Sequence, residues 1–283
     1  MGALFLPGQL YTLHRGNTSR TMSSRPWNRA LEFINGSNAT SGFFLHEDFR
    51  SFGLSTAVST NVGRYVGDGS TWYSFEDTGA SISQIATNVN GVVSLTTDAD
   101  DNQEVDLVSC GNTGVCGVIS DTAGDDKFQI FEARFSVSQI VTQNIFLGMG
   151  EEGLAADAGI IDDSGDHTSK DLIGFSVNED ASSTLVFSYR KAGQTEQFPI
   201  TSLATLAAST FVNVAWVYDP TAPRSKRISV YLNNEEQSTY VTADNIAAAT
   251  FPDAEEMAIY AAVKNVTDIT TLNLDSIAFY QAG

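Results

Sequence analysis

Basic side chains are scarce in this chain of 283 residues, and their scarcity excludes several classes of protein. Lysine and arginine together number 15 against 34 aspartates and glutamates, which gives a formal net charge of −19. Nucleic-acid-binding proteins gain much of their affinity from cations that neutralise phosphates, and anionic membranes attract proteins through the same cations. We therefore expect neither nucleic acid nor a membrane among the partners of this protein.

Long apolar runs are also missing, and cysteines are few. No stretch approaches the roughly 20 consecutive apolar residues that a membrane helix needs. The opening segment MGALFLPGQL lacks the leading positive charge and the length of a signal peptide, so we expect a protein made in the cytoplasm. Cys110 and Cys116 enclose a glycine-containing loop short enough to close through a disulfide, although a reducing cytoplasm favours two thiols.

Methionine is rare, whereas aromatic and β-branched residues are abundant. The chain has 4 Met against 17 Phe, 9 Tyr and 3 Trp, and its 23 Gly are spread as turn residues. This composition favours strands over helices. From Phe44 onward, short apolar segments are separated by polar turns and acidic loops, which predicts one antiparallel two-sheet β-sandwich over residues 44–283.

Particular segments give the strongest strand signals, because they are apolar-rich and several alternate with period two. The predicted strands are 128–135 with its return at 145–148, 172–177 with 185–189, 212–218 with 228–232, then 257–263 and 272–280. A polar turn is expected at Asn233–Asn234. One helical turn is expected at 202–208.

Residues 1–43 differ from the rest and predict an extended arm with at best one short helix near Pro26. Residues 1–46 carry four arginines against one acid, whereas the remainder has 11 basic and 33 acidic residues. Such an arm is expected to become ordered by lying on its own body or on a neighbouring subunit. The residues expected to bind a partner are Leu4, Phe5, Leu10, Tyr11, Arg15, Arg20, Arg25, Trp27 and Arg29.

Two segments carry a resemblance to a known fold family. FVNVAWVYDPTAPRSKRISVYLNN at 211–234 and LNLDSIAFYQ at 272–281 resemble strands of concanavalin A-like and laminin G-like jelly rolls. The resemblance implies a jelly-roll sandwich. In that family some members are glycoside hydrolases and others are lectins, so both activities have to be weighed.

Three further segments resemble virion structural proteins of tailed bacteriophages: NIFLGMGEEGLAADAG at 144–159, KDLIGFSV at 170–177 and YRKAGQT at 189–195. This resemblance implies a non-enzymatic capsid decoration, or cement, protein on the outer surface of the virion, made in the host cytoplasm. Its expected partners are the major capsid protein and neighbouring copies of itself in a homo-oligomer. The arm would then tie neighbouring capsomers together.

A glycoside hydrolase is the enzymatic alternative. Enzymes of this fold carry the pattern Glu-x-Asp-x-x-Glu, sometimes one residue shorter, because retaining chemistry needs a nucleophile and an acid/base close together. Glu104 and Asp106 match its beginning, but Ser109 or, in the shorter spacing, Val108 stands where the second glutamate is needed. We therefore expect no enzyme, and we expect the two acids to be solvated on one face of a strand.

Two binding roles stay open beside the structural one. The acidic loops offer Asp98, Asp100, Asp162 and Asp163 as weak calcium ligands, but neither loop has EF-hand spacing, so we expect no cofactor. A lectin-like module of a phage tail or fibre would instead bind host surface glycans through exposed aromatic side chains. Trp72 and Tyr73, in a glycine-rich segment, are the candidates for that role, whereas Trp216 lies in an apolar strand and is expected in the core.

Overall fold

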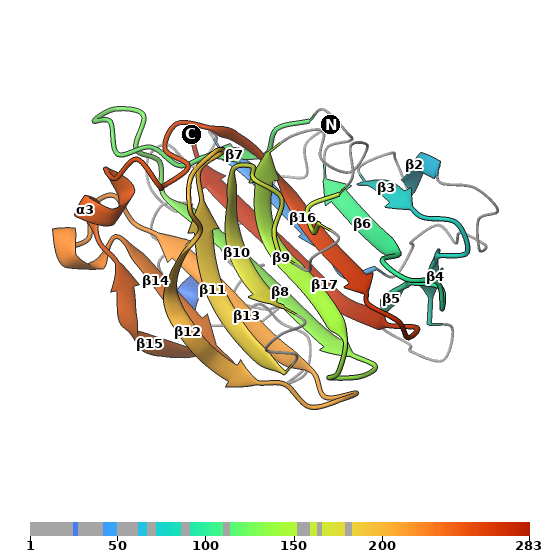
Figure 1. Ribbon diagram of the computed structural model, residues 1–283. Helices are drawn as coiled ribbons and strands as arrows, with labels where there is room; N and C mark the ends of the chain where they lie inside the picture. The colour runs from blue at the N-terminus through green and yellow to red at the C-terminus, as the bar shows by residue number, and fades with distance from the viewer. Residues whose placement is uncertain are drawn as a thin grey trace.

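Two antiparallel β-sheets pack face to face in the computed structural model, as the sequence predicts (Figure 1). The described residues are 25–27, 42–49, 62–66, 72–85, 91–109, 114–151, 159–162, 166–178 and 183–283. Within them, no helix is long and apolar enough to cross a membrane.

The first layer is an eight-stranded sheet with its longest strand near the middle. In spatial order it contains β15 (Glu235–Val241), β14 (Ile228–Leu232), β13 (Val212–Tyr218), β8 (Gln129–Val137), β17 (Thr271–Ala282), β5 (Val93–Thr96) and β4 (Ser81–Gln84), with β1 (Gly42–Glu47) also paired to β17. Strand β17 therefore has β8 on one side and β5 and β1 on the other.

The second layer is a nine-stranded sheet, and it carries the candidate site. In spatial order it contains β12 (Gln197–Thr205), β11 (Thr184–Arg190), β10 (Leu172–Val177), β9 (Gln143–Glu151), β16 (Glu256–Asn265), β6 (Glu104–Ser109), β3 (Trp72–Glu76) and β2 (Val62–Val66), with β7 (Gly117–Val118) also paired to β16. Short helical turns are found at 25–27, at η3 (Arg224–Lys226) and at α3 (Ala243–Ile246).

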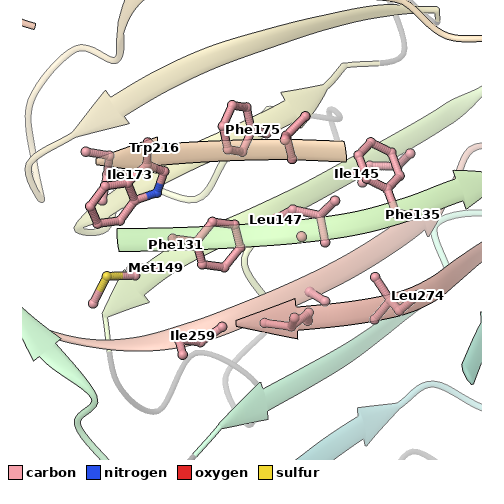
Figure 2. Close-up of a cluster of buried hydrophobic side chains, with 14 of the residues drawn as sticks. Phe131, Phe135, Ile145, Leu147, Met149, Ile173, Phe175, Trp216, Ile259 and Leu274 are labelled. Carbon is pink, nitrogen blue, oxygen red and sulfur yellow. The ribbon is translucent and has the colours of Figure 1, made fainter. Parts of the chain in front are cut away.

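The core fills the space between the layers with alternate side chains of each strand, because successive residues of a strand point to opposite faces. Phe131 of the eight-stranded sheet stacks on Trp216 of the same sheet at 6.2 Å and on Phe175 of the other sheet at 6.5 Å. Figure 2 shows this cluster, to which both layers contribute. Trp216 is fully buried, so its prediction as a core residue is confirmed.

Several pairings expected from the sequence are confirmed. Strand β10 pairs with β11, and β13 pairs with β14. Asn233 and Asn234 have φ values of 47° and 69° and connect β14 to β15, as expected of a tight turn.

Two local predictions are wrong. Segment 145–148 is not the return of 128–135, because β9 belongs to the other sheet and pairs with β10 and β16. Consecutive strands are often neighbours but need not be, and the strand pattern does not specify the sheet. Segment 202–208 does not form a helical turn, since β12 runs to Thr205 and buries Ile200 and Leu203 in the core, which overrides the local helix preference.

Of the predicted arm, the described residues are 25–27 and 42–43. Trp27 is fully buried on the outer face of the eight-stranded sheet of its own chain. In this arrangement the Trp27 side chain packs on its own chain and has no exposed surface left for a neighbouring subunit. The predicted partner contacts of Leu4, Phe5, Leu10, Tyr11, Arg15, Arg20 and Arg29 lie outside the described residues.

Candidate functional site

The outer face of the nine-stranded sheet presents a row of side chains that crosses six strands. By register the row contains Tyr73, Val108, Tyr260, Gly148, Gly174 and Ser188. Two glycines lie side by side in it, and a Cβ added to Gly148 would stand 2.3 Å from the Ile173 carbonyl oxygen. Because the two glycines have no side chains, the surface of the sheet is depressed at the centre of the row, where β9 and β10 approach each other closely.

A covering segment, residues 159–162 and 166–171, packs on this face. Ile160 and Ile161 are buried against a cluster that includes Phe146 of β9 and Tyr260 of β16. The segment is closed on itself, because Ile161 pairs with His167 and the Thr168 amide donates to the Ile160 carbonyl at 3.0 Å. The covering segment thus removes much of the sheet face from solvent.

Under the covering segment lies a charged cluster of Glu104, Asp106 and Lys264. These side chains stand on neighbouring strands and have exposed fractions of 2%, 0% and 4%. Glu104 Oε1 accepts hydrogen bonds from the Ile160 and Ile161 amides at 3.1 and 3.2 Å. Lys264 Nζ lies 3.5 Å from Glu104 Oε2 and donates to the Ile161 carbonyl at 3.1 Å. The prediction of two solvated acids is therefore wrong, because a segment remote in sequence covers them.

Burial changes the protonation of this pair. It raises the pKa of Glu104 well above its usual value, and the neighbouring charge of Asp106 raises it further. Burial also raises the pKa of Asp106 to about 7. Both oxygens of Asp106 are buried and accept no hydrogen bond from the described residues, which adds to the cost of ionising this group. The positive charge of Lys264 acts in the opposite direction and lowers the pKa of both acids.

The pair does not have the geometry of a retaining hydrolase site. Ser109, at the position of the missing glutamate, points into the core with no exposed surface. Its Oγ accepts from the Ile259 amide at 3.0 Å and lies 2.7 Å from Cys116 Sγ. Backbone amides of the covering segment donate to Glu104 and lie in the space that a substrate would have to occupy. Cys110, the other half of the predicted disulfide, lies outside the described residues, and Cys116 is buried.

A surface hollow of about 410 Å³ opens beside Asp166 of the covering segment. It is lined by Asp166, Arg190, Gly193, Gln194, Thr195, Glu196 and Phe198. Phe198 of β12 is 47% exposed, which is unusual for a large aromatic side chain beside charged groups. The turn between β11 and β12 shapes the hollow, and Gly193 adopts a φ of 74° there.

The polar groups of the hollow are held in place by the fold. Arg190 donates from Nε to the Gln194 carbonyl at 2.7 Å and from Nη1 to the His167 carbonyl at 2.8 Å. His167 Nδ1 lies 2.8 Å from Glu196 Oε1, and its ring meets Phe146 edge to face at 5.2 Å. Burial acts to raise the pKa of Glu196, but the hydrogen bond from His167 and nearby positive charge outweigh it, so that this pKa is lowered.

The aromatic residues predicted for glycan binding are placed differently. Trp72 is 1% exposed, faces the core beside Phe49 and donates from Nε1 to Glu47 at 3.4 Å. Its prediction as a glycan platform is therefore wrong, because alternation along β3 turns it inward. Tyr73 is half-buried on the outer face, where it packs against the cluster under the covering segment.

Of the predicted calcium ligands, the structure describes Asp98, Asp100 and Asp162. Asp98 and Asp100 use their carbonyl oxygens to hold the Asn265 amide at 2.6 and 2.9 Å. The Asp162 amide donates to the Asp166 carbonyl at 2.8 Å, and Asp163 lies outside the described residues. In the part of the chain that the structure describes, no group of three His, Cys, Asp or Glu side chains could hold a metal ion.

Sequence reasoning missed the residues of the hollow. Arg190 lies in a segment noted for its resemblance to virion proteins, but nothing local marks it as part of a site. Glu196 and Phe198 follow a polar turn, and an aromatic residue with polar neighbours at the start of a strand was the available signal. His167 has no paired histidine, so it could not be recognised from spacing.

The two antiparallel layers and their order define a concanavalin A-like jelly-roll sandwich. A protein of unknown function from Shewanella oneidensis MR-1 superposes with a TM-score of 0.52 at 14% identity, covering 94% of this chain and 97% of that one. A LamA variant from Z. galactanivorans in complex with laminaritriose and laminaritetraose has a TM-score of 0.53 at 8% identity, covering 86% and 99% of the two chains. Peanut lectin has a TM-score of 0.48 at 12% identity, covering 86% and 98%.

These identities show a shared fold alone. No protein-family model matches the sequence, and no curated protein matches it.

Proposed function

We propose that this protein is a non-catalytic carbohydrate-binding protein whose site is the hollow beside Phe198. The observation that carries the proposal is the exposed ring of Phe198 next to hydrogen-bonding groups that are already fixed, Arg190 and Glu196. A sugar ring offers an apolar face of C–H groups and a rim of hydroxyls, so it needs an aromatic surface beside donors and acceptors.

The chemistry of the hollow favours a neutral sugar. The Arg190 guanidinium has more N–H donors than its two carbonyl bonds use, while Asp166 and Glu196 supply carboxylate acceptors. A mixture of one cation with two acids suits hydroxyl groups better than an anionic ligand. The fold also serves a LamA structure bound to laminaritriose, but the proposal rests on the hollow rather than on that likeness.

The absence of catalysis is part of the proposal. Its support is the Ser109 side chain in the core and the enclosure of Glu104 and Asp106 beneath the covering segment. A buried carboxylate that accepts two backbone amides cannot reach a glycosidic oxygen without displacing the segment.

The test is calorimetric titration with a panel of neutral oligosaccharides that includes laminaritriose. The Phe198→Ala variant should bind at least about tenfold more weakly, equivalent to roughly 1.4 kcal/mol. Phe43→Ala is the matched control, because Phe43 is also exposed, at 37%, but lies away from the hollow. No binding by the wild-type protein, or equal losses in both variants, would contradict the proposed site.

A separate assay tests the non-catalytic part. Wild-type protein incubated with the bound oligosaccharides should release no new reducing ends. Hydrolysis that disappears in Glu104→Gln would show a catalytic role for the buried pair.

A second candidate function is a structural one, as a decoration protein on the outer capsid of a bacteriophage. The observation that favours it is the docking of the arm residues Arg25, which is basic, and Trp27 on an acidic body. The same contact could connect neighbouring bodies in a shell, with the major capsid protein beneath them. Electron cryo-microscopy of a particle that contains the protein would test this, because density over the capsid lattice supports the role and density at the tail alone opposes it.

A further inference from the structure

The outer face of the eight-stranded sheet holds a site built for one side chain, Trp27. The Trp27 site consists of Phe128, Ile130, Glu132, Val217, Ala278 and Tyr280, from β8, β13 and β17 and the residue before β8. Trp27 is fully buried in it, and its ring meets Phe44 of β1 edge to face at 5.9 Å. Burying a tryptophan removes a large apolar surface from water and is a typical anchor of an interface.

The Trp27 site contains one carboxylate, that of Glu132, and it is placed to accept a hydrogen bond from the indole N–H. Trp27 Nε1 donates to Glu132 Oε2, while Asn213 donates to Glu132 Oε1 at 2.7 Å. Glu132 is 3% exposed, so without Trp27 a buried carboxylate would lose the indole hydrogen bond. The Trp27 site therefore recognises an aromatic side chain with an N–H group, and not merely any apolar residue.

A second contact aligns the arm on the sheet. Arg25 forms an ion pair with Glu235, and its amide donates to Asn234 Oδ1 at 2.8 Å. Both acceptors lie at the turn that joins β14 and β15. An apolar anchor and a charged contact two residues away together fix the position and direction of the segment.

The connection from this segment to the sandwich is far longer than the gap it closes. Residues 28–41 provide 14 residues between Trp27 and β1, although the rings of Trp27 and Phe44 are only 5.9 Å apart. Such a length can reach roughly 50 Å when extended. The same contacts can therefore form with the segment supplied by another copy.

We propose that the Trp27 site is a docking site between copies of this chain, in which residues 25–27 of one copy occupy the Trp27 site of another. Exchange of an identical segment keeps every contact and is a low-cost route to a dimer. The basic arm and the acidic body favour the encounter. Because a connection of this length gives an effective concentration in the ~mM range, exchange competes when copies are crowded to that level.

The experiment mixes two single-cysteine variants of the full chain, Arg25→Cys and Glu235→Cys, at about 1 mM and treats the mixture with a short bis-maleimide. A covalent dimer between the variants can form efficiently only if the arm of one copy lies on the body of the other. The matched control mixes Arg224→Cys with Asp244→Cys, an ion pair at 2.9 Å within the body that cannot be exchanged. All four side chains are more than half exposed, so the variants should fold.

The mixture of Arg25→Cys and Glu235→Cys should give at least about tenfold more mixed dimer than the control mixture. The control yield measures cross-linking by random collision and by the native cysteines. Equal yields from the two mixtures would overturn the proposal. Adding Trp27→Ala to the Arg25→Cys variant should reduce the yield to the control value. An unchanged yield would show that the arm docks elsewhere and would overturn the assignment of the Trp27 site.

Discussion

The two outer faces of the sandwich are both covered by other parts of the chain, but by different physical means. On the eight-stranded sheet, Trp27 packs among apolar side chains, and the carboxylate of Glu132 receives a donor at each oxygen. On the nine-stranded sheet, the covering segment is held by Glu104 and Lys264, and the carboxyl group of Asp106 is buried beside them. The first cover depends on packing and the second on a balance of charge, so mutations and pH should affect them differently.

The largest effect is expected from removing the cation of the charged cluster. Lys264→Met should lower the free energy of unfolding by about 3 kcal/mol at pH 8, because a buried negative charge then has no counter-charge. The loss should be smaller at pH 5, where the acids are protonated. Urea denaturation at both pH values measures this, and equal losses would show that Lys264 acts only through packing.

A large effect is also expected where the covering segment touches Glu104. Gly159 has a φ of 75°, and a Cβ there would lie 2.3 Å from the Glu104 carboxyl carbon. Gly159→Ala should therefore destabilise the fold by about 3 kcal/mol, from backbone strain and the clash together. Gly124→Ala is the control, because Gly124 has a φ of 99° but no atom within 4 Å of the added Cβ.

The control variant should lose only about 1 kcal/mol in thermal or urea denaturation. Similar losses in the two glycine variants would mean that Glu104 moves aside without cost and that the covering segment is not tightly seated.

A smaller effect is expected from the protonation of Asp106. A carboxyl group whose pKa is raised on folding stabilises the fold while protonated, and this contribution is lost as pH rises through the folded value. With the pKa of Asp106 raised from 3.8 to about 7, stability should fall between those two pH values. Asp106→Asn should remove part of this decline and gain about 1 kcal/mol at pH 8.

Asp244→Asn is the matched control for the loss of one carboxylate, since the Asp244 side chain is 88% exposed. The control should keep the decline of the wild-type protein in denaturation curves recorded across this pH range. Equal declines in the wild-type protein and in Asp106→Asn would contradict the raised pKa of Asp106.

The smallest effect on stability is expected at the hollow. Phe198→Ala should change the free energy of unfolding by no more than about 0.5 kcal/mol, because the ring is half exposed and packs little. Its effect should appear in glycan affinity instead. A loss of several kcal/mol would assign Phe198 to the fold rather than to a binding surface.

The sequence predicted features that depend on neighbours along the chain. Alternation identified strands 172–177 and 185–189 and their pairing, and it placed Glu104 and Asp106 on the same face of one strand. It failed where distant segments decide the outcome. The acids are buried by residues 159–162, which follow them by more than fifty positions, and no local pattern in either segment indicates the contact.

The same limit applies to the candidate site. Arg190, Glu196 and His167 meet because a turn and the covering segment converge, and their polar character alone resembles that of many solvated residues. Trp72 illustrates the opposite case, since its segment favoured exposure but its position in β3 turned it into the core.

Strand β17 has a consequence for how the protein is made. It lies between β8 and the pair β5 and β1, so the eight-stranded sheet is split until residues 271–282 have been synthesised. Pairings between such distant segments form slowly, because much chain entropy is lost before any contact is gained. During synthesis β8 and β5 therefore expose unpaired edges, and we expect the nascent chain to depend on chaperones for longer than a helical protein of this length.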